Sequence, residues 1–331
     1  MLQSAPTAAG PGAAEKIVLL TGGAGFIGRC AVEPLLARGY QVHMATRAAS
    51  AEPRTDGVSI HPCDLFDAEQ VQALIERVSP THLLHFAWYA EPRLYWTSSR
   101  NLDCLRSSVQ LLQTFARRGG RRAVFAGTCA EYDWSFGYLS ETQTPTRPRT
   151  LYGACKHALQ ETTARFAETV NLSTAWGRIF FLYGPHEHAS RFVPSIIARL
   201  AEGRAARCNY GRHLRDFLHV DDVAGAFVCL LDSDLRGPVN IASGVPFSLG
   251  QVAEMIALKL GRPELLEVDD LPAVPDNPVV LLADVTRLKT ELGWSPRISL
   301  SAGLDQVLAA HAGAHRATSG SSSPTAVQPQ S

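Results

Sequence analysis

The chain has 331 residues, of which 46% are hydrophobic and 19% charged, and its 31 basic residues balance its 31 acidic ones. This composition is typical of a globular protein with one large or two smaller domains, and it argues against binding to nucleic acid or to an anionic membrane. The sequence has no apolar run near the ~20 residues of a membrane span, and residues 1–16 lack the regions of a signal peptide. Its seven cysteines are irregularly spaced, so we expect free thiols in a cytoplasmic protein.

A glycine-rich turn follows the first predicted strand. Residues 1–14 are rich in Ala, Gly and Pro and are predicted to be disordered, whereas residues 16–20 are an apolar run typical of a buried parallel strand. The turn TGGAGFIG occupies residues 21–28, and residues 27–38 have helical periodicity. This order of strand, turn and helix indicates a dinucleotide site, because a helix N-terminus attracts the pyrophosphate. A glycine-rich turn without a ligand is the alternative.

The three spaced glycines of the turn have separate tasks. Gly22 allows the tight turn, Gly25 lets the backbone approach a pyrophosphate, and Gly28 lets the helix pack closely on the sheet. The next predicted strand, residues 41–46, is followed by Arg47. An acidic residue at this place suits the ribose 2′-hydroxyl of NAD and a basic one suits the 2′-phosphate of NADP. Arg47 therefore favours NADP(H), with NAD(H) as the alternative.

Two further strand ends are predicted to border the cofactor. Strands are expected at residues 58–63 and 81–86, and helices at 67–78 and 98–118. Parallel strands bring their carboxyl ends to one edge of a sheet, where ligands bind. The residues at these two ends are Asp64, Leu65, Phe86, Ala87 and Trp88.

A fifth predicted strand, residues 121–127, leads to the candidate catalytic residues. Thr128 follows this strand, and Tyr152 and Lys156 are four residues apart, which places them on one face of a helix. An ammonium ~4 Å from a phenol stabilises the phenolate by up to ~4 kcal/mol at an effective dielectric of ~20. We therefore expect Lys156 to lower the pKa of Tyr152 from its usual ~10 toward neutrality. A solvated helix that carries this spacing by chance is the alternative.

Strands and helices that alternate in this way predict a doubly wound parallel sheet of the Rossmann type. The GxxGxxG turn together with Thr128, Tyr152 and Lys156 resembles the extended short-chain dehydrogenase/reductase family, in its nucleotide-sugar epimerase, dehydratase and reductase branch. The match covers residues 16–310. The resemblance implies an N-terminal Rossmann domain, a smaller C-terminal α/β substrate domain and a nucleoside-diphosphate sugar between them.

Several later residues are assigned through this resemblance. Residues 178–181, RIFF, are similar to the family's Arg-x-Phe-Asn, so Phe180 is expected near the nicotinamide and Phe181 replaces a polar substrate contact. Arg215 matches the arginine that pairs with the diphosphate, and Arg191 is a second candidate; a surface ion pair is the alternative for each. The predicted cofactor contacts are Gly22, Gly25, Phe26, Ile27, Gly28, Arg47, Asp64, Leu65, Phe86, Ala87, Trp88, Tyr152, Lys156 and Phe180, and the predicted substrate contacts are Thr128, Phe181, Arg191 and Arg215.

The expected domain organisation follows from the same resemblance. The Rossmann domain spans residues 15–182, with residues 217–245 returning to it, and the substrate domain spans mainly residues 183–314. The tail, residues 315–331, is rich in Ser, Thr, Pro and Gln and is predicted to be disordered. The family is often dimeric through the helices near residues 98–118 and 152–169, so we expect a homodimer.

Two short motifs near the centre of the chain are interpreted without a catalytic role. Asp221 is expected to cap a helix that runs to residue 231. His186, Glu187 and His188 form a cluster that suggests a metal, but it lacks a further ligand at a useful spacing, so no metal site is predicted.

The reaction is inferred from what surrounds Thr128. The family's dehydratases carry an Asp-Glu pair just after this threonine, and its decarboxylases carry a glutamate where Ala130 stands; here the two positions hold Cys129 and Ala130. Glu131 lies one position further, and adjacent residues of an extended segment point opposite ways. The missing groups leave 4-epimerisation or one-way ketoreduction. Residues 127–132, GTCAEY, look more like the family's 4-ketoreductases than its epimerases, so the resemblance implies an NAD(P)H-dependent 4-ketoreductase of a nucleoside-diphosphate 4-keto-6-deoxyhexose. A 4-epimerase with retained NAD is the rival enzyme, and a non-catalytic NADP sensor is the rival of another class.

Overall fold

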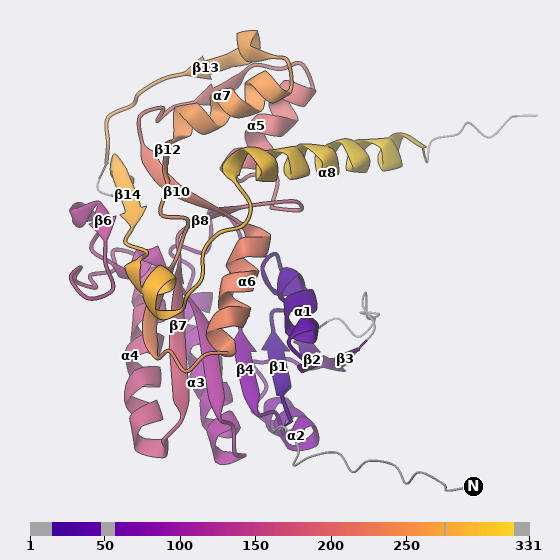
Figure 1. Cartoon of the computed structure of the whole chain (residues 1–331), viewed down its shortest axis with the longest axis vertical. Helices are drawn as coiled ribbons and strands as arrows, with labels where there is room; N and C mark the ends of the chain where they lie inside the picture. The colour runs from indigo at the N-terminus through magenta and orange to yellow at the C-terminus, as the bar shows by residue number, and fades with distance from the viewer. Residues whose placement is uncertain (1–14, 48–56, 275, 321–331) are drawn as a thin grey trace, which may run out of the picture.

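A seven-stranded parallel sheet forms the larger lobe, in the lower half of Figure 1. The computed structural model describes residues 15–47, 57–274 and 276–320, and the side chains of these up to residue 313. The strand order is β11–β7–β5–β4–β1–β2–β3, so the direction of winding reverses between β1 and β4. The predicted doubly wound sheet is confirmed. Its strands are β1 (Ile17–Thr21), β2 (Gln41–Thr46), β3 (Val58–Pro62), β4 (His82–His85), β5 (Arg122–Thr128), β7 (Ser173–Ile179) and β11 (Gly237–Ile241).

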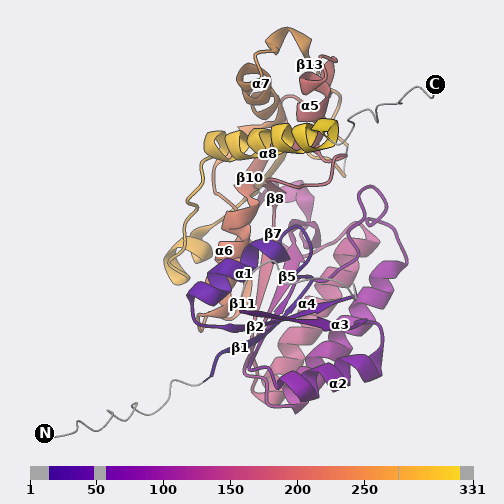
Figure 2. The ribbon, with the colours of Figure 1, turned by 90° about the vertical axis from the view of Figure 1, so that its right-hand side faces the viewer.

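Helices cover both faces of this sheet because successive strand residues point to opposite sides. In β1, Val18 and Leu20 belong to the core beneath α1 (Gly28–Ala37) and α6 (Val220–Leu231), whereas Leu19 belongs to the core on the other face. The second face is covered by three helices, seen together in Figure 2: α2 (Ala68–Val78), α3 (Arg100–Arg117) and α4 (Leu151–Val170). Burial on both faces explains why these strands are continuous apolar runs in the sequence.

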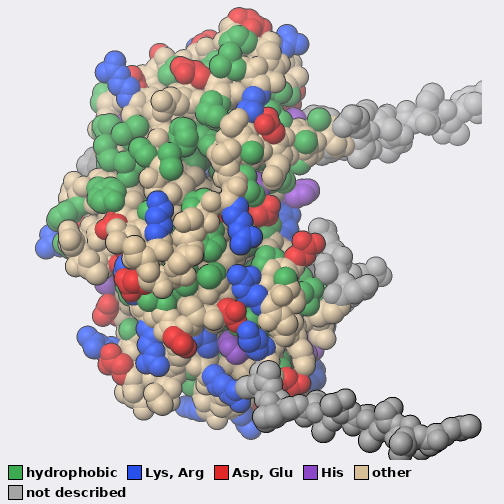
Figure 3. All heavy atoms as spheres, viewed as in Figure 1, with side chains coloured by type: hydrophobic (Ala, Val, Ile, Leu, Met, Phe, Trp, Pro, Cys, Tyr) green, Lys and Arg blue, Asp and Glu red, His purple; other side chains and the backbone are tan. Residues whose placement is uncertain are grey.

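The smaller lobe lies beyond the carboxyl ends of the large sheet (Figure 1). It contains a sheet of order β12–β10–β14–β6, with β8 paired to β10, and a separate β13–β9 pair. Figure 3 shows hydrophobic side chains gathered near β6 and β14, where Tyr138 and Val279 are exposed. Its elements are β6 (Tyr138–Leu139), β8 (Phe181–Tyr183), α5 (Phe192–Ala201), β9 (Ala206–Cys208), β10 (Leu214–His219), β12 (Pro246–Ser248), α7 (Leu249–Lys259), β13 (Leu266–Val268), β14 (Val280–Ala283) and α8 (Leu300–Gly320).

The chain leaves the large sheet at Phe180. The sequence predicts one strand over residues 173–181, but β7 ends at Ile179 and Phe181 begins β8, which pairs with β10 of the second sheet. Residues 179–182 are all apolar, so the hydrophobic pattern does not show where the chain passes from the large sheet to the second sheet. The domain boundary predicted after residue 182 falls inside β8, and its position stays a prediction.

Two local expectations are wrong. The side chain of His219, not that of Asp221, caps α6: its Nδ1 accepts from the Asp221 N–H at 3.3 Å. Helix α8 continues to residue 320, past the point where the tail was expected to begin, because its alanine-rich sequence favours helix. Residues 321–331 and 1–14, also predicted to be disordered, lie outside the described chain. In the described part, no helix is long and apolar enough to cross a membrane.

Candidate active site

The carboxyl end of β5 and the first turns of α4 bring together Thr128, Tyr152 and Lys156. Thr128 is the last residue of β5, and α4 begins one residue before Tyr152. The hydroxyl of Thr150 caps this helix by accepting from the Gly153 N–H at 3.1 Å, which fixes the direction in which Tyr152 leaves it. The hydroxyl of Thr128 hydrogen-bonds the phenol of Tyr152, and this bond acts to lower the phenol pKa.

Three aromatic side chains surround the phenol of Tyr152, and we call them the aromatic wall: Trp88, Tyr95 and Trp96. Their ring centroids lie 6.4, 4.9 and 5.7 Å from that of Tyr152, each with its ring edge-on. Burial raises the pKa of Tyr152 above its ordinary value. The expectation that Lys156 lowers this pKa is therefore wrong for this arrangement, because the ammonium is directed elsewhere.

The ammonium of Lys156 is buried beneath the wall. Its Nζ donates to the carbonyl oxygen of Ala126 at 2.7 Å and lies 3.8 Å from the ring centroid of Trp88. Burial lowers the pKa of Lys156 to about 7, while the carboxylate of Glu131 acts in the opposite direction. Lys156 can therefore exchange a proton near neutral pH, which is the property that the sequence assigned to Tyr152.

The glycine turn fits a dinucleotide pyrophosphate. Gly22 has φ of 69°, and a Cβ added there would lie 2.7 Å from the Ala87 nitrogen. A Cβ on Gly28 would lie 2.2 Å from the Gly22 carbonyl oxygen, so the helix approaches the turn closely only because residue 28 is glycine. Within the described chain, no side chain caps the first turn of α1. The N–H groups of Arg29 and Cys30 donate to the carbonyl oxygens of Gly25 at 3.3 Å and Ile27 at 3.0 Å, so an anion would meet the N–H groups that precede them.

The other predicted cofactor contacts line the same edge of the sheet. Phe26 and Ile27 are half-buried at the start of α1, and Asp64 and Leu65 are half-buried just after β3. Arg47 is exposed at the end of β2 and forms no ion pair with a residue that the structure describes. The residues after β4, Phe86, Ala87 and Trp88, are half-buried, and the backbone of the first two adjoins Gly22.

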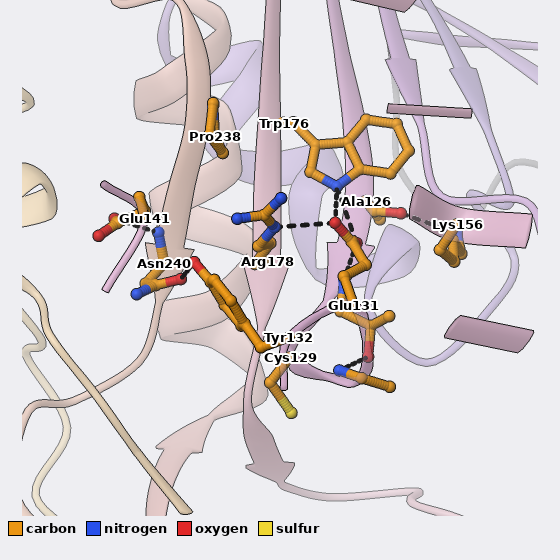
Figure 4. A network of polar contacts seen from close by, with 12 residues as sticks. Ala126, Cys129, Glu131, Tyr132, Glu141, Lys156, Trp176, Arg178, Pro238 and Asn240 are labelled. Carbon is orange, nitrogen blue, oxygen red and sulfur yellow. Dashed lines mark hydrogen bonds and ion pairs between the residues drawn. The ribbon is translucent and has the colours of Figure 1, made fainter. Parts of the chain in front are cut away.

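Glu131 is fully buried and is held in a polar network (Figure 4). Its Oε1 accepts from the Thr128 N–H at 2.8 Å and from Trp176 Nε1 at 2.9 Å, and its Oε2 accepts from Arg178 Nε at 2.8 Å. The carboxylate therefore braces the segment after β5. That segment is a short 3-10 helix, Cys129–Glu131, so the expectation of an extended segment is wrong, and it is these bonds that hold Glu131 away from a substrate role. Cys129, which directly follows Thr128, is also buried; burial raises the pKa of its thiol to about 12, so the thiol stays protonated.

The predicted substrate arginines come from different elements of the smaller lobe. Arg191 precedes α5, with its guanidinium 5.3 Å from the ring centroid of Tyr95. Arg215, on β10, is buried and lies 5.3 Å from the ring of Phe181. Its donors reach the Leu214 carbonyl at 2.8 Å and the side chain of Asn277, and burial lowers its pKa to about 10. Among the described residues it has no carboxylate partner.

The sequence interpretation missed four residues near this site. Tyr95 and Trp96 complete the aromatic wall. Asn101 hydrogen-bonds the indole of Trp88 and the backbone carbonyl of Tyr95. Only the density of aromatic residues over 88–96 could have signalled them. Glu187 Oε2 is buried without a hydrogen-bond partner in the described chain, and burial raises the pKa of Glu187 to about 8. Within the described ranges, no group of three His, Cys, Asp or Glu side chains could hold a metal.

Residues 18–242 match the model of the NAD dependent epimerase/dehydratase family. A UDP-glucose 4-epimerase of Corynebacterium glutamicum is 25% identical over 305 residues, covering 84% of this chain and 90% of that protein. A UDP-glucuronic acid decarboxylase 1 of Xenopus tropicalis is also 25% identical, with 89% and 72% covered. Among solved structures, a Thermus thermophilus UDP-glucose 4-epimerase in complex with NAD has a TM-score of 0.78 at 26% identity, covering 90% of this chain and 99% of that one.

Proposed function

We propose that this chain, which belongs to the NAD dependent epimerase/dehydratase family and so to the extended short-chain dehydrogenases/reductases, is a one-way ketoreductase. In this proposal hydride passes from a nicotinamide cofactor to a ketone at C4 of a nucleoside-diphosphate 4-keto-6-deoxyhexose. The relatives named as UDP-sugar epimerases and decarboxylases support a nucleotide sugar as the substrate class.

The observation that carries the proposal is the state of the three residues after Thr128. Elimination or decarboxylation needs an acid or base besides the hydride carrier. Cys129 keeps its proton, Ala130 has none to exchange, and Glu131 is bound to Arg178 and Trp176. Tyr152 is then the proton carrier at the reacting carbon, and hydride transfer with one protonation is the reaction that this set supports.

Each residue has one task in the proposed reaction. The bound dinucleotide supplies the hydride. Tyr152 donates a proton to the carbonyl oxygen, and a phenol with a raised pKa holds that proton until charge develops on the oxygen. Thr128 orients the carbonyl by a second hydrogen bond. Lys156 is assigned to hold the nicotinamide ribose, and the phenolate regains its proton from solvent after the product leaves.

We propose NADPH as the preferred reductant, with NADH also accepted. The exposed guanidinium of Arg47 at the end of β2 supports a 2′-phosphate. The solved relatives named with NAD show that the same fold takes the cofactor without this phosphate. Dissociation constants of NADPH and NADH, measured by fluorescence on the wild type, decide the preference.

A 4-epimerase is the second candidate, because the printed names of several relatives give that activity. The two functions differ in cofactor retention. We expect the purified protein to need added NADPH and to consume it with the keto sugar. Tightly bound NAD, with two epimers equilibrated and nothing added, identifies the epimerase instead. Saturable cofactor and sugar binding with no turnover over a broad panel of nucleotide sugars identifies the non-catalytic sensor.

We also propose a cytoplasmic homodimer that associates through α3 and α4. These helices pack on each other, and Leu102 of α3 and Val170 of α4 are exposed hydrophobic residues. The seven cysteines are free, as a reducing compartment requires. Light scattering on the wild type and on Leu102→Glu tests the interface; a monomeric wild type contradicts it.

A further inference from the structure

The aromatic wall is held in place by one buried side chain. Asn101, near the start of α3, has no exposed surface. Its Oδ1 accepts from the indole Nε1 of Trp88 at 2.8 Å, and its Nδ2 donates to the carbonyl oxygens of Tyr95 at 2.7 Å and Ser98 at 2.8 Å. The amide of Asn101 therefore fixes the ring of Trp88, and it also fixes the backbone of the segment that carries Tyr95 and Trp96.

Both halves of the wall bear directly on the proton-transfer groups. The ring of Trp88, which Asn101 holds through its Oδ1, lies over the Lys156 ammonium, with its centroid 3.8 Å from Nζ. On the other half, the carbonyl oxygen of Trp96 accepts from the Tyr152 N–H at 3.1 Å, and Tyr95 packs edge-on against the phenol. A shift of the wall therefore changes the environment of both the phenol and the ammonium.

We propose that Asn101 is a positioning residue that sets the cofactor side of the site through Trp88 and the sugar side through the Tyr95–Trp96 segment. This inference rests on the proposed function, because it takes the sugar to lie against Tyr152. The aromatic wall presents mainly apolar ring surface and few hydrogen-bond donors, which suits the apolar face of a deoxygenated sugar. A displacement of about 1 Å in such a wall is enough to slow a reaction about a hundredfold.

The chain offers a matched control in Asn240. This asparagine is also fully buried, its Oδ1 accepts from an aromatic side chain, Tyr132 Oη at 2.7 Å, and its Nδ2 donates to the carbonyls of Leu139 and Asp284. Figure 4 shows it on the far side of Arg178 from Lys156. Replacement of either asparagine by alanine removes the same number of bonds of the same kinds, and only one of the two touches the wall.

The experiment compares Asn101→Ala with Asn240→Ala in the purified full-length enzyme. Cofactor dissociation constants are measured by NADPH fluorescence, and KM and kcat are measured with a nucleoside-diphosphate 4-keto-6-deoxyhexose. We expect Asn101→Ala to raise both the cofactor dissociation constant and the sugar KM about tenfold, the factor expected for one net hydrogen bond on each side. Asn240→Ala should lower the melting temperature similarly and leave both constants within about twofold.

Two single-sided variants keep the test valid if Asn101→Ala does not fold. Trp88→Phe removes the Oδ1 bond and part of the ring over Lys156, and it leaves the amide bonds to the Tyr95 and Ser98 carbonyls; it should weaken cofactor binding while the sugar KM holds. Asn101→Asp keeps the acceptor for Trp88 and removes the amide donor to two carbonyls, so it should raise the sugar KM while cofactor binding holds.

Equal effects of Asn101→Ala and Asn240→Ala on these constants overturn the inference, as does an unchanged sugar KM in Asn101→Asp. Failure of the proposed function looks different. In that case the wild type does not reduce the keto sugar, and the same constants are compared in the epimerisation that it does catalyse.

Discussion

Two buried charged centres near the carboxyl end of β5 are satisfied to very different degrees (Figure 4). The carboxylate of Glu131 accepts from a backbone N–H, an indole and a guanidinium, all within 3.1 Å. The ammonium of Lys156 has one carbonyl oxygen and the face of an indole, and no ion pair with a described residue. A fully satisfied group fixes structure, whereas an under-satisfied one has a shifted pKa and can exchange protons. The contrast separates the bracing residues of this site from its reacting ones.

The largest expected effect comes from removing the proton carrier. We expect Tyr152→Phe to lower kcat by about 10²–10⁴-fold, because general acid catalysis contributes a factor of this size. Cofactor binding and the melting temperature should change little, since the hydroxyl is bonded only to Thr128 among described side chains. Steady-state rates together with thermal unfolding check this. A kcat within tenfold of wild type shows that another group carries the proton.

Breaking the satisfied centre should affect stability more than chemistry. Glu131→Ala leaves Arg178 buried without its partner, and loss of one member of a buried pair costs about 3–5 kcal/mol of unfolding free energy. Urea denaturation measures the change. Glu131→Gln is the matched variant: it keeps an acceptor and should lose less. If Glu131→Gln folds normally and loses turnover as completely as Tyr152→Phe, Glu131 belongs to the chemistry.

The under-satisfied centre predicts a pH dependence of stability. The pKa of Lys156 is lowered to about 7 from an unfolded value near 10.5. Between these values the unfolded chain binds more protons than the folded one, so the stability linked to Lys156 rises as pH rises through this window. The slope is at most about 1.4 kcal/mol per pH unit. Denaturation of wild type and Lys156→Met from pH 6.5 to 9.5 tests this; parallel curves show that Lys156 has an ordinary pKa.

The smallest expected effect concerns Arg47, at the exposed end of the cofactor site. Arg47→Ala should weaken NADPH about tenfold and leave NADH unchanged, because only the 2′-phosphate requires a cation there. The ratio of the two dissociation constants is the measurement, and Arg77→Ala, on the nearby helix α2, is a control. Equal weakening of both cofactors assigns Arg47 a role other than phosphate recognition.

The sequence predicts the larger lobe well and the wall of the site poorly, for physical reasons. A position where an added Cβ would lie within 3 Å of backbone atoms, such as Gly28, requires glycine and so leaves a local mark in the sequence. So does a helix that begins with a threonine cap before Tyr152. The contact of Asn101 with Trp88 depends on packing between segments 13 residues apart, and an isolated asparagine carries no sign of it. The sequence also predicts the wrong direction for the pKa shift of Tyr152. The spacing of Tyr152 and Lys156 shows that they share a helix face, but burial, which depends on tertiary packing, decides the direction of the shift.

We propose that, among the described residues, Tyr152 alone carries a proton at the reacting carbon, which confines the enzyme to hydride transfer. This claim is tested most directly by reducing the keto sugar in D₂O with NADPH deuterated at the transferred position. Mass spectrometry of the product should show one carbon-bound deuterium, delivered from the cofactor to C4, and none from solvent beyond an enzyme-free control. Solvent deuterium at a carbon next to C4, present with the wild type and absent without enzyme, would contradict the claim, because it requires a second acid or base.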